Sequence, residues 1–114
     1  MLKKDILRRK DDFTSIYKRG KSVGQKYIVL FYKKNNLPYN RIAFLASKKV
    51  GNSVERNRAR RLMKENFRIL KHQIMEGYDL IFIARTTIND RSFFDVKKSM
   101  YNALRKAKLY EIKK

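Results

Sequence analysis

Residues 47–61 read SKKVGNSVERNRARR, and this stretch decides the fold of the chain. Two lysines precede a turn at Gly51, and several arginines follow within the first part of a long segment with helical periodicity. Asn52 or Ser53 is suited to cap that helix, because a side-chain oxygen at this position can accept a hydrogen bond from a free backbone N–H. The pattern continues to about residue 75, and Gly77 follows it as a stop signal.

At about 100° per residue this helix has two faces. Its polar arc holds Arg56, Asn57, Arg60, Arg61, Lys64 and Arg68, and its apolar arc holds Ala59, Leu62, Met63, Asn66, Ile69 and Leu70. We expect the apolar arc to pack on a sheet and the cationic arc to face outward. Glu55 or Glu65 could pair with nearby arginines, but two carboxylates cannot neutralise so many cations, and like charges four residues apart repel each other. This face therefore indicates a polyanionic partner.

The whole chain shares this charge. Its 114 residues contain 30 Lys and Arg against 10 Asp and Glu, for a formal net charge of +20. Their hydrophobic content of 43% is enough for one modest core. We expect a single RNA-binding domain over residues 1–114, with residues 1–9 as an irregular basic arm. Phosphate groups would relieve the strong repulsion among its cations.

Several function classes are disfavoured. The chain has no cysteine, so it can form neither a disulfide nor a thiolate metal site. A cationic membrane-binding protein is an alternative, but no window approaches 18 consecutive apolar residues. The first residues are charged where a secretory signal would be apolar, so we expect a cytoplasmic protein.

The remaining pattern predicts an α-β-β-α-β-α order. We expect a helix from Asp11 or Asp12 to about Lys18, strands over 27–32 and 41–47 paired as a hairpin, a buried strand over 78–84, and a helix after a Ser92–Asp95 capping box to about Leu109. A further short strand is possible near residues 21–23.

The preference for arginine favours folded RNA as the partner, because a planar guanidinium can bind phosphate bidentately and stack on bases. Lys48 and Lys49 lie just before the helix, where free N–H groups and the positive dipole end attract anions. Gly51 can simply permit the tight turn, and both interpretations can hold together.

SKKVGNSVERNRARR closely resembles the signature of the bacterial ribonuclease P protein subunit. The resemblance extends along essentially the whole chain, including DDF…IYKRGKSV within residues 11–23 and YDLIFIAR over residues 78–85. It implies a subunit of a ribonucleoprotein endoribonuclease, a hydrolase that removes the 5′ leader from precursor tRNA. In that family a large RNA holds the catalytic Mg²⁺ ions, so the implied partners are ribonuclease P RNA and precursor tRNA, with no membrane or DNA.

The resemblance also assigns roles to residues. It implies that the RNA subunit contacts Arg56, Asn57, Arg58, Arg60, Arg61, Lys64 and Arg68. The leader would lie on a sheet face beside the first helix, against Phe13, Tyr17 and Phe31, with Lys48 and Lys49 at its edge. Aromatic rings stack unpaired bases with little sequence preference, which suits leaders of varied sequence. Without the resemblance, Phe13 and Tyr17 at helical spacing would more readily be core residues.

The fold that the resemblance implies is a two-layer α+β sandwich, with a mixed sheet and helices on one face, like domain IV of elongation factor G. Its relatives contain a left-handed β-α-β crossover, the opposite of the usual hand.

Nothing in the sequence indicates catalytic residues within this chain. Its acids are dispersed without a paired metal motif, and His72 is the one histidine. A ribosomal or other structural RNA-binding protein remains an alternative function. A sequence-specific DNA-binding protein is a further alternative, although the arginine arc lacks the mixture of base-reading side chains that such proteins use.

Overall fold

The computed structural model describes residues 2–111, so Met1 of the expected arm and residues 112–114 of the expected domain lie outside the described residues. Its elements are η1 (Lys3–Asp5), α1 (Lys10–Arg19), β1 (Lys21–Gly24), β2 (Ile28–Lys34), β3 (Arg41–Leu45), α2 (Ser53–Leu70), η2 (Lys71–Gln73), β4 (Tyr78–Ala84), η3 (Thr86–Ile88) and α3 (Phe93–Lys106). The short strand that was possible near residues 21–23 is present as β1. The α+β class and the mixed sheet are confirmed.

Four strands form one sheet in the order β1-β2-β4-β3. Strand β4 is antiparallel to β2 and parallel to β3, so the chain reaches β4 from β3 through a crossover that contains α2. The hairpin predicted between residues 27–32 and 41–47 is therefore wrong. The apolar strand β4 lies between these segments, because it is buried on both faces and fits only the interior of the sheet.

The loop between β2 and β3 passes over the start of β4. There the Asn40 side chain donates to the Met75 carbonyl and accepts from the Tyr78 N–H, at 2.9 and 2.8 Å. The N–H of Asn35 also donates to the Gly77 carbonyl at 2.9 Å. These bonds hold the polar loop across the strand that separates its two ends.

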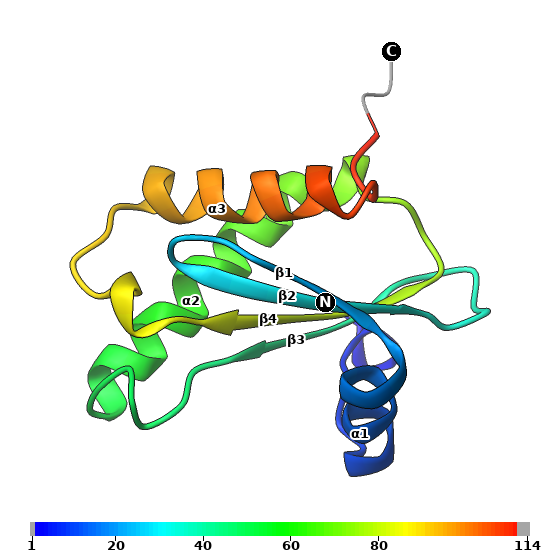
Figure 1. The fold of residues 1–114 in the computed structure, drawn as a ribbon, viewed down its shortest axis with the longest axis horizontal. Helices are drawn as coiled ribbons and strands as arrows, with labels where there is room; N and C mark the ends of the chain where they lie inside the picture. The colour runs from blue at the N-terminus through cyan, green and yellow to red at the C-terminus, as the bar shows by residue number, and fades with distance from the viewer. Residues whose placement is uncertain (1, 112–114) are drawn as a thin grey trace.

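Helices α2 and α3 cover one face of the sheet, and α1 lies on the opposite face (Figure 1). The expectation of helices on one face thus holds for α2 and α3 and is wrong for α1, whose Ile16 packs on the opposite face of the sheet. The main core contains Ile28, Leu30, Leu80 and Phe82 from the sheet, packed against both helices.

The buried face of α2 is turned slightly from the predicted one. Ile69, expected in the core, is 52% exposed, whereas Phe67 is buried and packs against Phe44 and Phe82. The large Phe67 ring reaches the sheet and sets the rotation of the helix.

Two helix ends also differ from expectation. Arg9, not Asp11 or Asp12, precedes α1 without a side-chain cap. Helix α2 ends at Leu70, where the 3-10 turn η2 follows, and Ile74 then forms a bridge with Tyr110.

Helix α1 is held over part of its sheet face by a small second core of Leu7, Ile16, Ala43 and Ile81. The basic arm that precedes it is irregular apart from η1, yet it contacts the sheet. Ile6 forms a parallel bridge with Ile42, and the Leu7 N–H donates to the Ile42 carbonyl at 2.9 Å.

Candidate RNA interface

The turn before α2 is fixed from beneath and presents lysines outward. Val50 is 3% exposed, and its carbonyl accepts a hydrogen bond from the Asn89 side chain. Lys48 and Lys49 are exposed. Strand β3 ends at Leu45, whose side chain lies on the α1 side of the sheet. Lys48 and Lys49 follow shortly after this residue.

Asn52, one of the two caps that the sequence predicts, begins α2, and it does so in a capping box with Glu55. Its Oδ1 accepts from the Glu55 N–H at 2.9 Å, while Glu55 Oε1 accepts from the Asn52 N–H at 3.1 Å. Gly51 has φ of 150°, and a Cβ at this position would lie 2.3 Å from Glu55 Oε1. The glycine therefore makes room for the capping carboxylate, whose oxygen is engaged with the backbone.

The arginine face, defined as Arg56, Asn57, Arg60, Arg61, Lys64 and Arg68, is directed away from the core. Arg61, Lys64 and Arg68 are exposed, and Arg60 donates a hydrogen bond to the Asn57 side chain. Within residues 2–111, both ion pairs shorter than 4.0 Å belong to Arg41. Glu55 and Glu65 thus neutralise no arginine of this face in the described structure.

Arg58 is placed differently from the other cations predicted to meet the RNA subunit. One of its guanidinium N–H groups donates to the Arg91 carbonyl at 2.7 Å, in the loop before α3. The side chain therefore lies toward the α3 side of α2. Its part in RNA contact stays a prediction, whereas its link to the Arg91 loop is a structural role that the sequence did not indicate.

The three aromatic residues predicted to meet the leader are brought together. The Tyr17 ring lies edge-on to the Phe31 ring, with centroids 5.0 Å apart, and 6.4 Å from the Phe13 ring. Phe13 and Phe31 are half-buried, while Tyr17 is 43% exposed. Partial burial raises the pKa of the Tyr17 phenol above its ordinary value of 10.0.

The aromatic cluster continues into a strip of sheet. Val29 and Ile83 are cross-strand partners, and both are half-buried. They lie on the same face as Phe31 and Ile81, because residues two apart on a strand share a face. The sequence analysis did not identify these two apolar residues. Once Phe31 is assigned to this face, the alternation of side chains along a strand also assigns Val29 to it. Pairing with β4 then adds Ile83.

A buried ion-pair network supports the cluster from the sheet side. Asp79 is 3% exposed and accepts from Arg41 Nε at 2.8 Å and Arg41 Nη2 at 2.7 Å. Arg41 also reaches Asp12 of α1, with its Nη1 3.4 Å from the carboxylate. The hydrogen bonds and charge of Asp79 raise the pKa of Arg41 above its ordinary value. The network therefore connects α1 to β3 and β4.

The arginine face and the aromatic cluster meet at the outer edge of β3. A hollow of about 240 Å³ there is lined by both Phe13 of α1 and Lys64 of α2, with Leu7, Phe44 and Leu45 around it. A single strand of nucleic acid could thus pass from aromatic rings to cations along one continuous surface.

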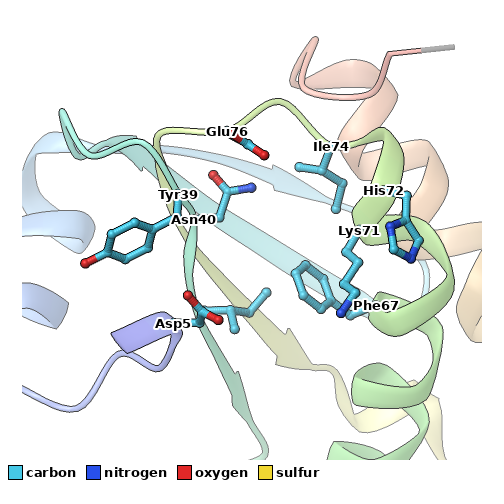
Figure 2. A pocket seen from close by; sticks show the side chains of 9 residues that line it. Asp5, Tyr39, Asn40, Phe67, Lys71, His72, Ile74 and Glu76 are labelled. Carbon is cyan, nitrogen blue, oxygen red and sulfur yellow. The ribbon is translucent and has the colours of Figure 1, made fainter. Parts of the chain in front are cut away.

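A different hollow of about 350 Å³ lies between the start of β3 and the end of α2 (Figure 2). Asp5 and Glu76 line it together with Lys71 and His72, so its charges are mixed. His72 lies in η2, just after the end of α2, and its side chain is exposed. In Figure 2 the Tyr39 ring points away from His72 and Lys71.

Within residues 2–111, no group of three or more His, Asp or Glu side chains could hold a metal ion. No helix in this part of the chain combines the length and apolar character needed to cross a bilayer.

Comparison with known proteins gives consistent matches. A family model described as Ribonuclease P matches residues 1–108. The ribonuclease P protein component of Clostridium botulinum (strain Langeland / NCTC 10281 / Type F) is 43% identical over 110 residues, which are 96% of this chain and 99% of the relative. That of Thermoanaerobacter sp. (strain X514) is 42% identical over 104 residues, covering 91% of this chain and 90% of the relative.

Solved structures agree with these relatives. The Staphylococcus aureus RNase P protein is 32% identical with a TM-score of 0.85, covering 94% of this chain and 98% of that one. The Thermotoga maritima RNase P protein is also 32% identical, with a TM-score of 0.80 and coverages of 88% and 94%.

Proposed function

This chain belongs to the ribonuclease P protein family, and on that premise we propose that it assembles with a catalytic RNA and assists removal of the 5′ leader from precursor tRNA. The observation that carries the proposal is the arginine face. Its cations are stacked on one side of α2 and, within residues 2–111, make no ion pair with a carboxylate. Such a face costs stability through repulsion unless phosphates are bound to it.

The second part of the proposal concerns the leader. The aromatic cluster of Phe13, Tyr17 and Phe31, extended by Val29 and Ile83, would stack unpaired leader bases. Lys48 and Lys49 would hold the leader backbone at the end of β3. Because every base has an aromatic face, this surface would tolerate leaders of different sequence.

The role of the chain in catalysis would be electrostatic. Precursor tRNA and the catalytic RNA are both polyanions, so each phosphate brought between them is repelled unless a cation is nearby. We assign hydrolysis of the phosphodiester bond to the RNA, with Mg²⁺ held mainly by the RNA. The arginine face would order that RNA and reduce the concentration of free Mg²⁺ needed for activity.

The proposal is tested by reconstitution. The purified chain is combined with ribonuclease P RNA, and leader removal from precursor tRNA is followed over a Mg²⁺ series. We expect the largest stimulation at low Mg²⁺, because there the protein cations replace missing counterions. Absence of stimulation at any Mg²⁺ concentration, or tighter binding to ribosomal RNA than to ribonuclease P RNA, would contradict the proposal.

A further inference from the structure

A second cationic hollow lies away from the arginine face and the aromatic cluster. It has a volume of about 540 Å³, and we call it the lysine pocket. Its walls include four cations, Arg19, Lys21, Lys33 and Lys34, and two aromatic rings, Tyr32 and Tyr78. No carboxylate is among the residues that line it, in contrast to the mixed hollow of Figure 2.

The sheet register builds this pocket as an alternation of lysine and tyrosine. Lys21 of β1 lies opposite Tyr32 of β2, and Lys34 of β2 lies opposite Tyr78 of β4. Tyr32 and Lys34 are two apart on one strand, so all four side chains lie on the same face of the sheet. Tyr32 and Tyr78 pack against the main core on the α2 and α3 side. The pocket therefore lies on the opposite face from Phe31 and the aromatic cluster.

The close approach of α1 to β2 fixes the pocket wall. A Cβ at Gly20 would lie 2.5 Å from the Ile16 carbonyl oxygen and 2.6 Å from the Tyr32 carbonyl oxygen. Only glycine fits this junction, which holds Arg19 and Lys21 beside Tyr32. The arrangement of cations is thus determined by the backbone and not by flexible side chains alone.

The pocket is also at the other end of the sheet from the start of α2. Helix α2 begins after β3 ends. Strand β3 is parallel to β4 and β2 is antiparallel to β4, so β3 and β2 run in opposite directions. Since the pocket lies where β2 ends and β1 begins, it lies at the opposite end of the strands from the start of α2 (Figure 1). A ligand of the pocket would extend the cationic contact well beyond α2.

From this arrangement we propose that the lysine pocket is a second RNA site, at which cations bind backbone phosphates and the tyrosine rings contact one unpaired base. The chemistry fits, because lysines hold phosphates as point charges and tyrosine rings offer faces for stacking. The inference rests on the proposed function, since it takes the catalytic RNA as the partner. The protein would then contact two separate segments of that RNA.

The first test measures binding to ribonuclease P RNA over a salt series. The variant Lys21→Ala/Lys34→Ala removes two exposed cations, and Lys26→Ala/Lys98→Ala removes two exposed lysines beside Asp95 as a matched control. Two lost phosphate contacts should lower the slope of log Kd against log salt by about 1.5 to 2 and weaken binding roughly tenfold or more at 0.1 M salt. We expect the control to keep the wild-type slope.

The outcomes separate the two proposals. Wild-type protein that fails to bind the catalytic RNA would refute the proposed function itself. Wild-type protein that binds, together with a Lys21→Ala/Lys34→Ala variant of unchanged affinity and slope, would refute only the second site. An equal loss in the control variant would also refute it, because the effect would then reflect net charge.

The second test maps the RNA near the pocket in the assembled complex. The chain has no cysteine, so Lys106→Cys, an exposed position next to the pocket-lining Ala107, gives a unique attachment point for a tethered Fe(II)-EDTA group. Glu65→Cys on α2 serves as the reference position. We expect cleavage from position 106 in an unpaired RNA segment that differs from the segment cut from position 65. Cuts from position 65 with none from position 106 would overturn the proposal.

Discussion

Substitution of Tyr17 by alanine tests the leader surface most directly. Tyr17 is the most exposed ring of the aromatic cluster, at 43%, so its removal disturbs the core less than removal of Phe13 or Phe31. Its edge contact with Phe31 contributes about 0.5–1.5 kcal/mol to folding beyond area burial. That loss is small beside the stability of a typical domain, about 5–15 kcal/mol.

The expected loss in binding follows from stacking. One base stacked on an aromatic ring is worth about 1–3 kcal/mol, which corresponds to roughly 5- to 150-fold in Kd. If the leader binds the cluster as proposed, the loss should apply to precursor tRNA and not to mature tRNA, which lacks a leader. Tyr17→Phe should bind like the wild type, because phenylalanine keeps the aromatic ring on which a base would stack.

The assay compares Kd of the reconstituted holoenzyme for precursor and mature tRNA. Thr14→Ala, on the same helix and exposed, is the matched control, and thermal unfolding verifies that each variant is folded. Equal losses for the two tRNAs, or a Tyr17→Ala variant with wild-type precursor affinity, would show that Tyr17 contacts no leader base.

Three other predictions concern the arginine face, the buried ion pair and a helix cap. Arg61→Ala/Arg68→Ala should lower the salt slope of binding to the catalytic RNA by about 1.5 to 2, and an unchanged slope would mean that neither side chain meets a phosphate. Asp79→Asn should destabilise the fold by about 3 kcal/mol, because Arg41 loses its buried charge partner; chemical denaturation measures this, and a change below about 1 kcal/mol would contradict it. Hydrogen bonds from Ser92 lower the pKa of Asp95 below 3.8 in the folded state, so its stabilising effect is present above that pH and is lost as the pH falls through the lower folded value. Unfolding of wild type and Asp95→Asn across pH 2–5 should therefore converge at the acid end, and parallel curves would contradict this role.

Local sequence signals predicted much of the fold. The apolar run of residues 78–84 gave the bounds of β4, and the cap at Asn52 or Ser53 and the Ser92–Asp95 capping box marked the starts of α2 and α3. The strand order was not accessible in the same way. Proximity in sequence favoured a hairpin of β2 with β3, whereas burial of β4 on both faces requires it to separate them. A left-handed crossover from β3 through α2 to β4 is an expectation of the family resemblance alone, because general rules favour the other hand.

The candidate site was predictable where it depends on helical periodicity. The direction of the arginine face follows from spacing along α2, but the position of Arg58 depends on a carbonyl in the Arg91 loop, which no local pattern reveals. The meeting of Phe13, Tyr17 and Phe31 required knowing that α1 crosses β2. The lysine pocket depends on strand register, since Lys34 and Tyr78 are far apart in sequence and become neighbours only through pairing of β2 with β4.

The central place of β4 bears on how the protein is made. Because this strand pairs with both β2 and β3, β3 has no partner strand and β2 has only β1 until residues 78–84 leave the ribosome. Helix α2 is synthesised before the strand that supports it, so the nascent chain is an unfolded polycation for most of its synthesis. An RNA that binds only the completed fold would then act as a folding ligand, drawing the late-closing sheet toward its native state by mass action.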